Sequence, residues 1–509
     1  MAAAAPTGSD TALIALGQGA IMVLGGVLAL LVAQLFGKDA RTDAFFAAYG
    51  VYSVGLMFAQ TFRLTAVSRL AQAGGSETIT RLLGSVAILA LIFAIPMVVL
   101  ADPLGRLLVE GASSGTAATA LRILWIALAG QLLAAMLSTF LMVRGAFTVI
   151  GVATLLAGLV SIATFLLLQG PFGIAAAATG LAASATWLTA VFGSRLLQAG
   201  WRPTRLGRGS LARMCSEAGR LVFASATFIG TNMAFVICLA VAARLGEGNA
   251  TLFSYGFVLA VMLVGVTVNV SAMVRSPSLV ADRGSASDSA AVGVWCFRFT
   301  VVLCGPVLAM ALLVGKPVIG FALGSRFSGG DIDEILVTLV CLVGWILGSA
   351  AGIFAIVELL ARDETRRLAV LATFQVATIL GLAVIGGALL GIAGLAVALS
   401  VVMLGVTLVQ QRLAFGEQWR HGAAAMGRAA GREVVVVVSA FAPSVVLLAV
   451  FDQTTLMTVC SAVLAAVLAA LVTRVAWPRE SGALISLLSR RKPDAAPAVP
   501  AQPDNARAS

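Results

Sequence analysis

Apolar runs of about twenty residues recur along most of the chain, separated by short polar segments. Runs of this length that are apolar on all faces cross a bilayer as helices, whereas membrane β-strands alternate apolar and polar residues over about ten positions. The mean hydropathy of +1.04 agrees, because such a chain would be insoluble as a water-exposed globule. We therefore predict an all-α integral membrane protein with fourteen transmembrane helices. The predicted spans are 12–36, 43–62, 82–101, 119–143, 148–169, 173–198, 220–244, 251–274, 292–315, 335–360, 368–390, 392–414, 434–451 and 456–477.

The sequence also repeats itself. Arg144 precedes the tripeptide Gly-Ile-Ala at 173–175 by the same spacing at which Arg362 precedes Gly-Ile-Ala at 391–393. We interpret this as a duplication in which helices 1–6 correspond to helices 7–12. Because six is even, both halves enter the membrane in the same direction, which predicts two parallel six-helix lobes followed by two additional C-terminal helices. Such lobes leave a cavity at their interface, where most secondary transporters bind substrate.

The positive-inside rule gives the predicted orientation. With the N-terminus inside, most of the 33 Lys and Arg residues fall in cytoplasmic connections, so both termini are predicted to be cytoplasmic. The net charge of +11 then indicates attraction to anionic lipids of the inner leaflet and not nucleic-acid binding. The predicted segments are a cytoplasmic N-terminus (1–11), an N-lobe (12–198), a basic linker (199–219), a C-lobe (220–414), a basic loop (415–433), helices 13 and 14 (434–477) and a largely disordered cytoplasmic tail (478–509).

Residue types that carry catalysis are scarce. The single histidine, His421, lies in a basic loop, and His and Cys pairs at metal-ligand spacing do not occur in the sequence. Gly315-Lys316 lacks the remaining residues of a phosphate-binding loop. We expect no enzymatic activity, no metal and no cofactor.

Residues 37–46, with the sequence GKDARTDAFF, connect the first two predicted helices. This segment resembles the Gly-x-x-x-x-Thr-Asp-Ala-Phe-Phe motif of the MurJ/MviN lipid II flippases, members of the multidrug/oligosaccharidyl-lipid/polysaccharide exporter superfamily. Further similar segments are RGAF at 144–147, RSPSL at 275–279 and ARDETR at 361–366. The resemblance covers roughly residues 12–477 and includes the family's fourteen helices.

The resemblance implies a flippase of the bacterial inner membrane. It would move an undecaprenyl-pyrophosphate-linked glycan, lipid II or a similar peptidoglycan precursor, to the outer leaflet by alternating access of the two lobes. The family carries cavity-facing arginines on helices 1, 2 and 8, which suit a pyrophosphate. Here helix 1 has no charge between Ala12 and Phe36, and Arg63 and Arg275 lie at the cytoplasmic ends of helices 2 and 8.

Other functions stay open because of this difference. One is a flippase for an exopolysaccharide or capsule lipid-linked oligosaccharide. Another is a non-transporting membrane scaffold, whose partners would be cell-envelope synthesis enzymes. A drug or cation antiporter of the same superfamily is disfavoured, because it would normally use twelve helices and buried acids. For a transporter, the membrane potential or a cation gradient would supply the energy, about 2.3 kcal/mol per charge at 100 mV.

Two sets of residues are candidates for function. The substrate or gate candidates are Asp43, Arg63, Arg144, Arg275 and Arg362, and the cavity or coupling candidates are Gln131, Asn232, Asn269, Glu358 and Gln375. Each also has a structural explanation. Asp43 would cap the start of helix 2, the arginines would only signal topology, Glu358 would pair with Arg362 at helical i,i+4 spacing, and the amides would hydrogen-bond between helices.

Overall fold

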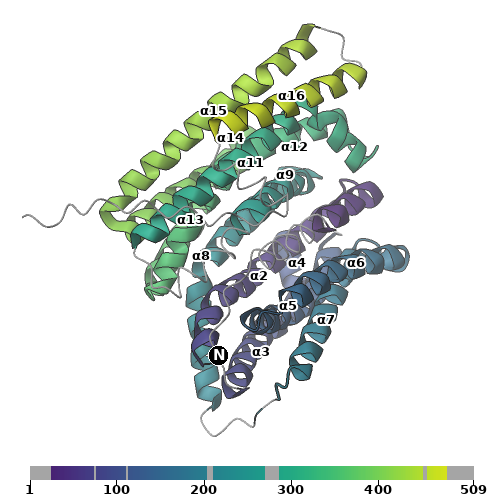
Figure 1. The fold of residues 1–509 in the computed structure, drawn as a ribbon. Coiled ribbons are helices and arrows are strands. Elements are labelled where there is room, and N and C mark those ends of the chain that lie inside the picture. The colour runs from purple at the N-terminus through teal and green to yellow at the C-terminus, as the bar shows by residue number, and fades with distance from the viewer. Residues whose placement is uncertain are drawn as a thin grey trace, which may run out of the picture.

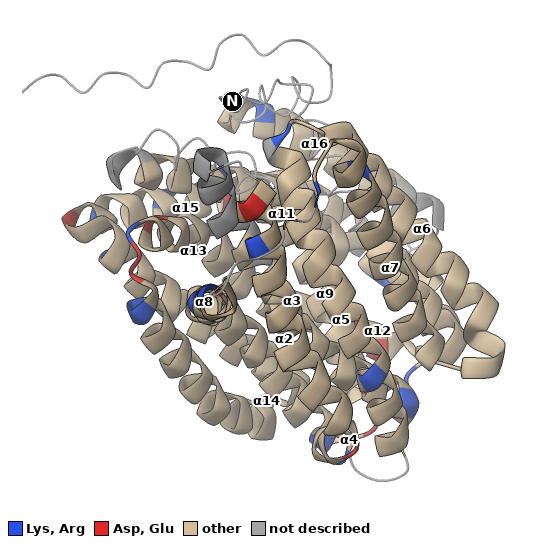
Figure 2. Cartoon of the chain, turned by 90° about the horizontal axis from the view of Figure 1, so that it is seen from below, with Lys and Arg blue, Asp and Glu red and all other residues tan. Residues whose placement is uncertain are grey.

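The structure is a computed structural model that describes residues 24–73, 76–109, 113–202, 204, 210–269, 286–450 and 455–477. Every regular element within these residues is a helix, which confirms the predicted all-α fold (Figure 1). In this part of the chain, eight helical stretches are long and apolar enough to cross a membrane, and shorter apolar helices occupy Leu24–Phe36, Asn249–Val264 and Cys460–Ala476. Lys, Arg, Asp and Glu residues are sparse along the helices (Figure 2). This is the architecture of a multi-pass membrane protein.

The helices of the first half pack around α5. Beyond the helix Leu24–Phe36, they are α2 (Ala40–Ala73), α3 (Ser76–Val99), α4 (Ala101–Leu108), α5 (Ser114–Val143), α6 (Phe147–Phe172) and α7 (Ala175–Gln198). Helix α5 contacts α2, α3, α4 and α7, and α6 lies along α7.

The second half continues with α8 (Ser210–Leu245), α9 (Asn249–Val264), the π-helix η2 (Gly265–Asn269), α11 (Ala286–Leu323), α12 (Gly329–Cys341), α13 (Val343–Ala361), α14 (Thr365–Phe415), η3 (Gly416–Gln418), α15 (Trp419–Val450) and α16 (Thr455–Ala476). Helix α14 packs on α8 and α13, and α12 packs on α9. Helices α15 and α16 contact each other and α11. The two halves meet where α8 and α9 lie against α2 and where α8 lies against α3.

Most described helices overlap the predicted spans, but their bounds differ, and the short helix α4 was not predicted as a separate helix. Helix α2 continues to Ala73, beyond the predicted end at residue 62, so Arg63 lies within this helix and not at its end as expected. The predicted helix 335–360 is divided at Leu342, between α12 and α13. Helices α8 and α15 begin at Ser210 and Trp419, so they extend into the predicted basic linker and basic loop. The extension of α15 is rich in alanine, which favours continued helix. Residues 12–23 and 270–274 of the predicted spans, and the predicted tail 478–509, lie outside the described residues.

A matched pair of glycines separates the last two helices of each half. Gly173, between α6 and α7, has φ 54° and ψ −137°. Gly391, at the equivalent position of the second half, has φ 61° and ψ −138° and divides α14 into two helices, as the spans 368–390 and 392–414 predict. This backbone conformation is essentially restricted to glycine. The duplication seen in the sequence is therefore accompanied by the same chain reversal in both halves.

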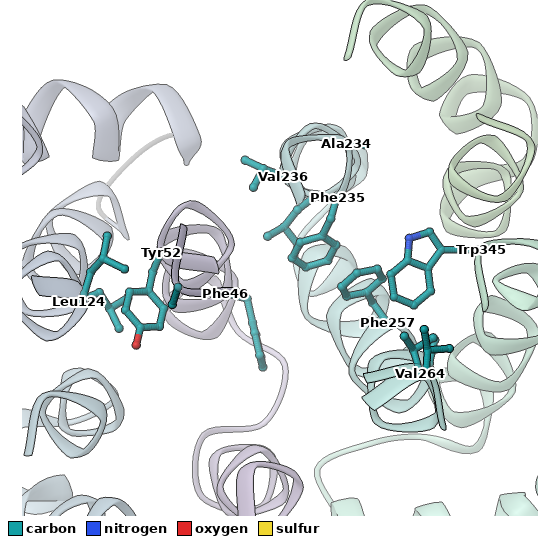
Figure 3. Close-up of a cluster of buried hydrophobic side chains, with 14 of the residues drawn as sticks. Phe46, Tyr52, Leu124, Ala234, Phe235, Val236, Phe257, Val264 and Trp345 are labelled. Atoms are coloured by element: carbon teal, nitrogen blue, oxygen red, sulfur yellow. The ribbon is translucent and has the colours of Figure 1, made fainter. Parts of the chain in front are cut away.

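An aromatic cluster fixes the middle of the second half. The rings of Phe235 on α8 and Phe257 on α9 stack with centroids 4.0 Å apart, and Trp345 on α13 lies 4.9 Å from Phe257. Figure 3 shows this cluster on one side and Phe46 and Tyr52 of α2 on the other. Aromatic pairs of this kind contribute roughly 0.5–1.5 kcal/mol beyond the area they bury. The cluster holds α8, α9 and α13 as one packed unit against which α2 lies.

Candidate gate between the two halves

Asp43 joins the two halves through its carboxylate. It lies in the first turn of α2 and is buried, with 4% of its surface exposed. Its Oδ2 accepts a hydrogen bond from the Gly248 amide at 2.7 Å, and its Oδ1 accepts from the amide and the hydroxyl of Thr251 at 2.8 and 2.6 Å. Asp43 therefore caps the N-terminus of α9, where a negative charge is favourable. We call Asp43, Gly248 and Thr251 the Asp43 latch.

The expectation that Asp43 caps its own helix is wrong, because the helix that it caps is α9 of the other half. Asp39 has that role, because its Oδ1 accepts from the amide and hydroxyl of Thr42 at 2.8 and 2.9 Å. Asp43 lies one helical turn further on, and its carboxylate reaches the other half. The motif at 37–46 thus contains two carboxylates with separate duties.

Further polar contacts surround the Asp43 latch at the same end of the molecule. Lys38 Nζ pairs with Asp331 Oδ1 at 2.5 Å, and the Ala40 amide donates to Glu247 Oε1 at 3.2 Å. The Gln34 side chain donates to the Ala322 carbonyl at 2.8 Å. Because Lys38 is 37% exposed, its ion pair contributes only about 0–1 kcal/mol. These contacts tie the start of α2 to the loop before α9 and to the first turn of α12, and the helix Leu24–Phe36 to the end of α11.

Aromatic rings close the space beside the latch. Tyr255 of α9 lies between Phe46 of α2 and Phe327, with ring centroids 5.3 and 5.8 Å away, both in edge-to-face geometry. Its hydroxyl donates to the Ala29 carbonyl at 3.2 Å. All three rings are buried. The two halves are therefore closed against each other at this end.

Arg144 and Arg362 end matching helices with matching backbone. Arg144 follows α5 with φ −89° and ψ 2°, and Arg362 follows α13 with φ −84° and ψ 2°. Each is followed by a residue of positive φ, Gly145 at 76° and Asp363 at 59°. The symmetry of the sequence is thus retained in the local structure.

Their side chains bind within their own halves. Arg144 Nη1 donates to the Ala199 carbonyl at 3.3 Å, beyond the end of α7. Arg362 pairs with Glu358 at 2.8 Å, as the i,i+4 spacing predicts, and Glu358 Oε2 accepts from Ser289 of α11 at 2.7 Å. Neither arginine reaches the other half in this conformation. The contacts favour a structural role at this end of the lobes.

A contact between halves at that end involves residues that the sequence analysis did not identify. Arg81 of α3 pairs with Glu217 of α8 at 3.3 Å, and the Ser85 hydroxyl donates to the same carboxylate at 3.3 Å. No motif marks Glu217, which lies in the segment predicted as a linker. Its role depends on the extension of α8 to Ser210.

Of the remaining candidates, the structure describes the side chains of Asn232, Gln375 and Gln131. Asn232 donates to the Phe228 carbonyl of its own helix at 3.1 Å. Gln375 is 1% exposed, with Nε2 at 3.4 Å from the Thr231 hydroxyl and an Oε1 that has no partner among the described residues. Gln131 is half-buried on α5. Arg63 and Asn269 lie in α2 and η2 with side chains outside the described part, and Arg275 lies outside the described residues.

Metal-ligating residues do not gather in the described part of the chain. No group of three or more His, Cys, Asp or Glu side chains there could hold an ion. The polar contacts described at the candidate gate are hydrogen bonds and an ion pair.

The fold is similar to those of solved flippase and transporter structures. A structure described as lipid II flippase MurJ in an inward closed conformation superposes with a TM-score of 0.70 and 14% sequence identity, over 92% of this chain and 99% of that one. This chain has the MurJ fold. The sequence-based resemblance to MurJ/MviN flippases is thus confirmed at the level of the fold.

The MurJ fold is shared with related transporters. A MATE protein in complex with MaL6 has a TM-score of 0.60 and 16% identity over 82% of this chain and 97% of its own. A MOP superfamily transporter from Pyrococcus furiosus has a TM-score of 0.58 and 13% identity over 83% and 96%. No protein-family model and no curated protein matches the sequence. The similar structures are therefore those of flippases and transporters.

Proposed function

We propose that this chain is a flippase of the bacterial inner membrane, with cytoplasmic termini, that moves a polyprenyl-pyrophosphate-linked glycan to the outer leaflet. Lipid II or a similar peptidoglycan precursor is the proposed substrate. The observation that carries the proposal is the Asp43 latch, in which a buried carboxylate of one half caps a helix of the other. A polar latch between two packed halves is suited to alternating access.

The proposed transport cycle opens the latch at the periplasmic end. A pyrophosphate and sugar headgroup cannot cross hydrocarbon unaided, so the halves must part around a hydrated path. Opening breaks three hydrogen bonds to Asp43, and water then solvates both the carboxylate and the α9 amides. Hydrogen bonds to a charged group contribute about 1.5–3 kcal/mol each, so the closed state is favoured but not locked.

Arginines at the cytoplasmic mouth are proposed to meet the substrate first. Arg63 lies in the part of α2 that extends beyond the predicted span 43–62, and Arg275 follows the predicted end of helix 8 on that side. A guanidinium binds phosphate oxygens through paired hydrogen bonds, which suits a pyrophosphate. The basic segments near the same face would also attract anionic inner-leaflet lipids.

The test is rescue of cells depleted of their own lipid II flippase. Expression of this chain is expected to restore the appearance of lipid II in the outer leaflet, measured with an impermeant probe of the exposed headgroup. Asp43→Ala, inserted to the same level, is expected to restore much less. Failure of the native chain despite normal insertion would overturn the lipid II proposal. The same assay with a lipid-linked exopolysaccharide unit would then separate a different flippase from a scaffold.

A further inference from the structure

A buried carboxylate lies where α11, α15 and α16 meet. Glu433 of α15 is 3% exposed, and its Oε2 accepts a hydrogen bond at 2.8 Å from the indole nitrogen of Trp477, which directly follows α16. The other oxygen, Oε1, is buried without a hydrogen-bond partner among the described residues. It is directed at α11, because a Cβ built on Gly305 would lie 2.9 Å from it.

The charged groups of these helices leave the carboxylate unpaired. On α15, Arg428 and Arg432 are exposed, as is Arg474 of α16. Arg432 stacks its guanidinium over the Trp477 ring, 4.9 Å from the centroid. Arg298 of α11 lies two helical turns before Gly305, about 10 Å along the helix. Within the described residues, no arginine is at ion-pairing distance from Glu433.

An unpaired charge in this position is costly. A buried carboxylate needs a cationic partner or several hydrogen-bond donors, and Glu433 has one neutral donor on one oxygen. A proton on Oε1 removes the charge and leaves the bond from Trp477 to Oε2 intact. Oε1 is buried and faces Gly305 of α11, so no solvent-accessible space adjoins it for a larger ligand such as a hydrated cation. The occupant that fits is therefore a proton.

We propose that Glu433 is a proton-binding site that holds the C-terminal helix pair α15 and α16 against α11. In the packed arrangement, Oε1 binds one proton and the carboxyl is neutral. When α15 and α16 move away from α11, water reaches the carboxylate and the proton is released to solvent. No other covalent bond changes. This inference rests on the proposed flippase function: the site would make movement of α15 and α16 during transport depend on proton concentration.

The direct test is infrared difference spectroscopy on the purified full-length protein in lipid vesicles, titrated with acid and base. A carboxylic-acid C=O band that persists at neutral pH and disappears in alkali is expected. It should be absent in Glu433→Gln and present in Glu358→Gln, a matched control because Glu358 is paired with Arg362 and Ser289. A band unchanged in Glu433→Gln, or no such band in the native protein, would overturn the proposal.

A second variant keeps the test independent of how well a glutamine side chain packs in place of Glu433. Trp477→Phe removes the donor to Oε2, so the charged form loses its hydrogen bond. The midpoint of the band is expected to move to higher pH by about one unit. An unchanged or lower midpoint would contradict the assignment. Neither measurement uses a substrate. The spectroscopic result for Glu433 can therefore be interpreted even if the rescue assay overturns the flippase proposal.

Discussion

Thr189 and Thr407 occupy equivalent positions in the two halves and donate equivalent interhelical hydrogen bonds. The Thr189 hydroxyl of α7 is 2.9 Å from the Gly130 carbonyl of α5 and equally close to the Ala185 carbonyl of its own helix. The Thr407 hydroxyl of α14 donates to the Gly348 carbonyl of α13 at 3.0 Å. Each threonine follows its glycine partner by 59 residues in the chain. The two halves thus share a hydrogen bond as well as the chain reversals and helix ends described above.

Removal of either threonine hydroxyl is expected to weaken its own half. Thr189→Val and Thr407→Val should each lower the thermal stability of the purified protein by about 0.5–1.5 kcal/mol. The two effects should add, since the sites lie in separate halves. Thermal unfolding in detergent measures this, with Thr186→Val as control because its hydroxyl donates only within its own helix and is exposed. Strong coupling between the two variants would contradict independent lobes.

Loss of the Asp43 carboxylate is expected to open the candidate gate. Asp43→Ala removes three hydrogen bonds across the interface, so transport should fall at least roughly tenfold at normal insertion. A cysteine at Ala250, buried in the closed state, should become more reactive toward an impermeant thiol reagent. Asp102→Ala is the matched control, because Asp102 pairs with Arg122 in an exposed contact. Full transport in Asp43→Ala would show that the latch is only structural.

The effects of removing Arg144 and Arg362 are expected to be independent, so that their free-energy contributions add. Arg144 binds Ala199 and Arg362 binds Glu358, with no shared partner. The double variant Arg144→Ala with Arg362→Ala should therefore reduce transport more than either single change, by about the product of the two single effects. Outer-leaflet substrate measured in the depleted cells gives the comparison. Undiminished transport would leave both residues as topology signals.

The glycine chain reversals are expected to reject a side chain. Gly173→Ala and Gly391→Ala force a residue with a Cβ into a conformation that costs about 1–3 kcal/mol. The stability measured by thermal unfolding should fall by that amount in each variant. Gly170→Ala and Gly381→Ala are controls, because they lie within helices and a Cβ at either meets open space. These controls should be neutral or stabilising, by up to about 1 kcal/mol. Equal losses of stability in all four variants would show that the backbone conformation of Gly173 and Gly391 is not what excludes a side chain.

The sequence predicts the fold better than it predicts the contacts of the candidate gate. Hydropathy predicts the helices because each membrane span must form its backbone hydrogen bonds within itself, so the signal lies in the sequence of that span alone. The partner of Asp43 depends on how two halves pack, and Gly248 is far away in the sequence. The Arg81–Glu217 pair and the Glu433 site were missed for a related reason. Both acids lie in segments that their basic residues predict to be a linker and a loop, whereas α8 and α15 extend into these segments as helix.

The Asp43 latch also has a consequence for biosynthesis. The chain is made from the N-terminus, so Asp43 is in place long before Gly248 and Thr251 leave the ribosome. Until α9 arrives, the carboxylate must stay at the watery edge of the membrane, because an unpaired charge is costly inside it. Arrival of α9 then satisfies donor and acceptor together. Correct insertion of the second half is therefore what supplies the hydrogen-bond donors that the Asp43 carboxylate of the first half lacks until then.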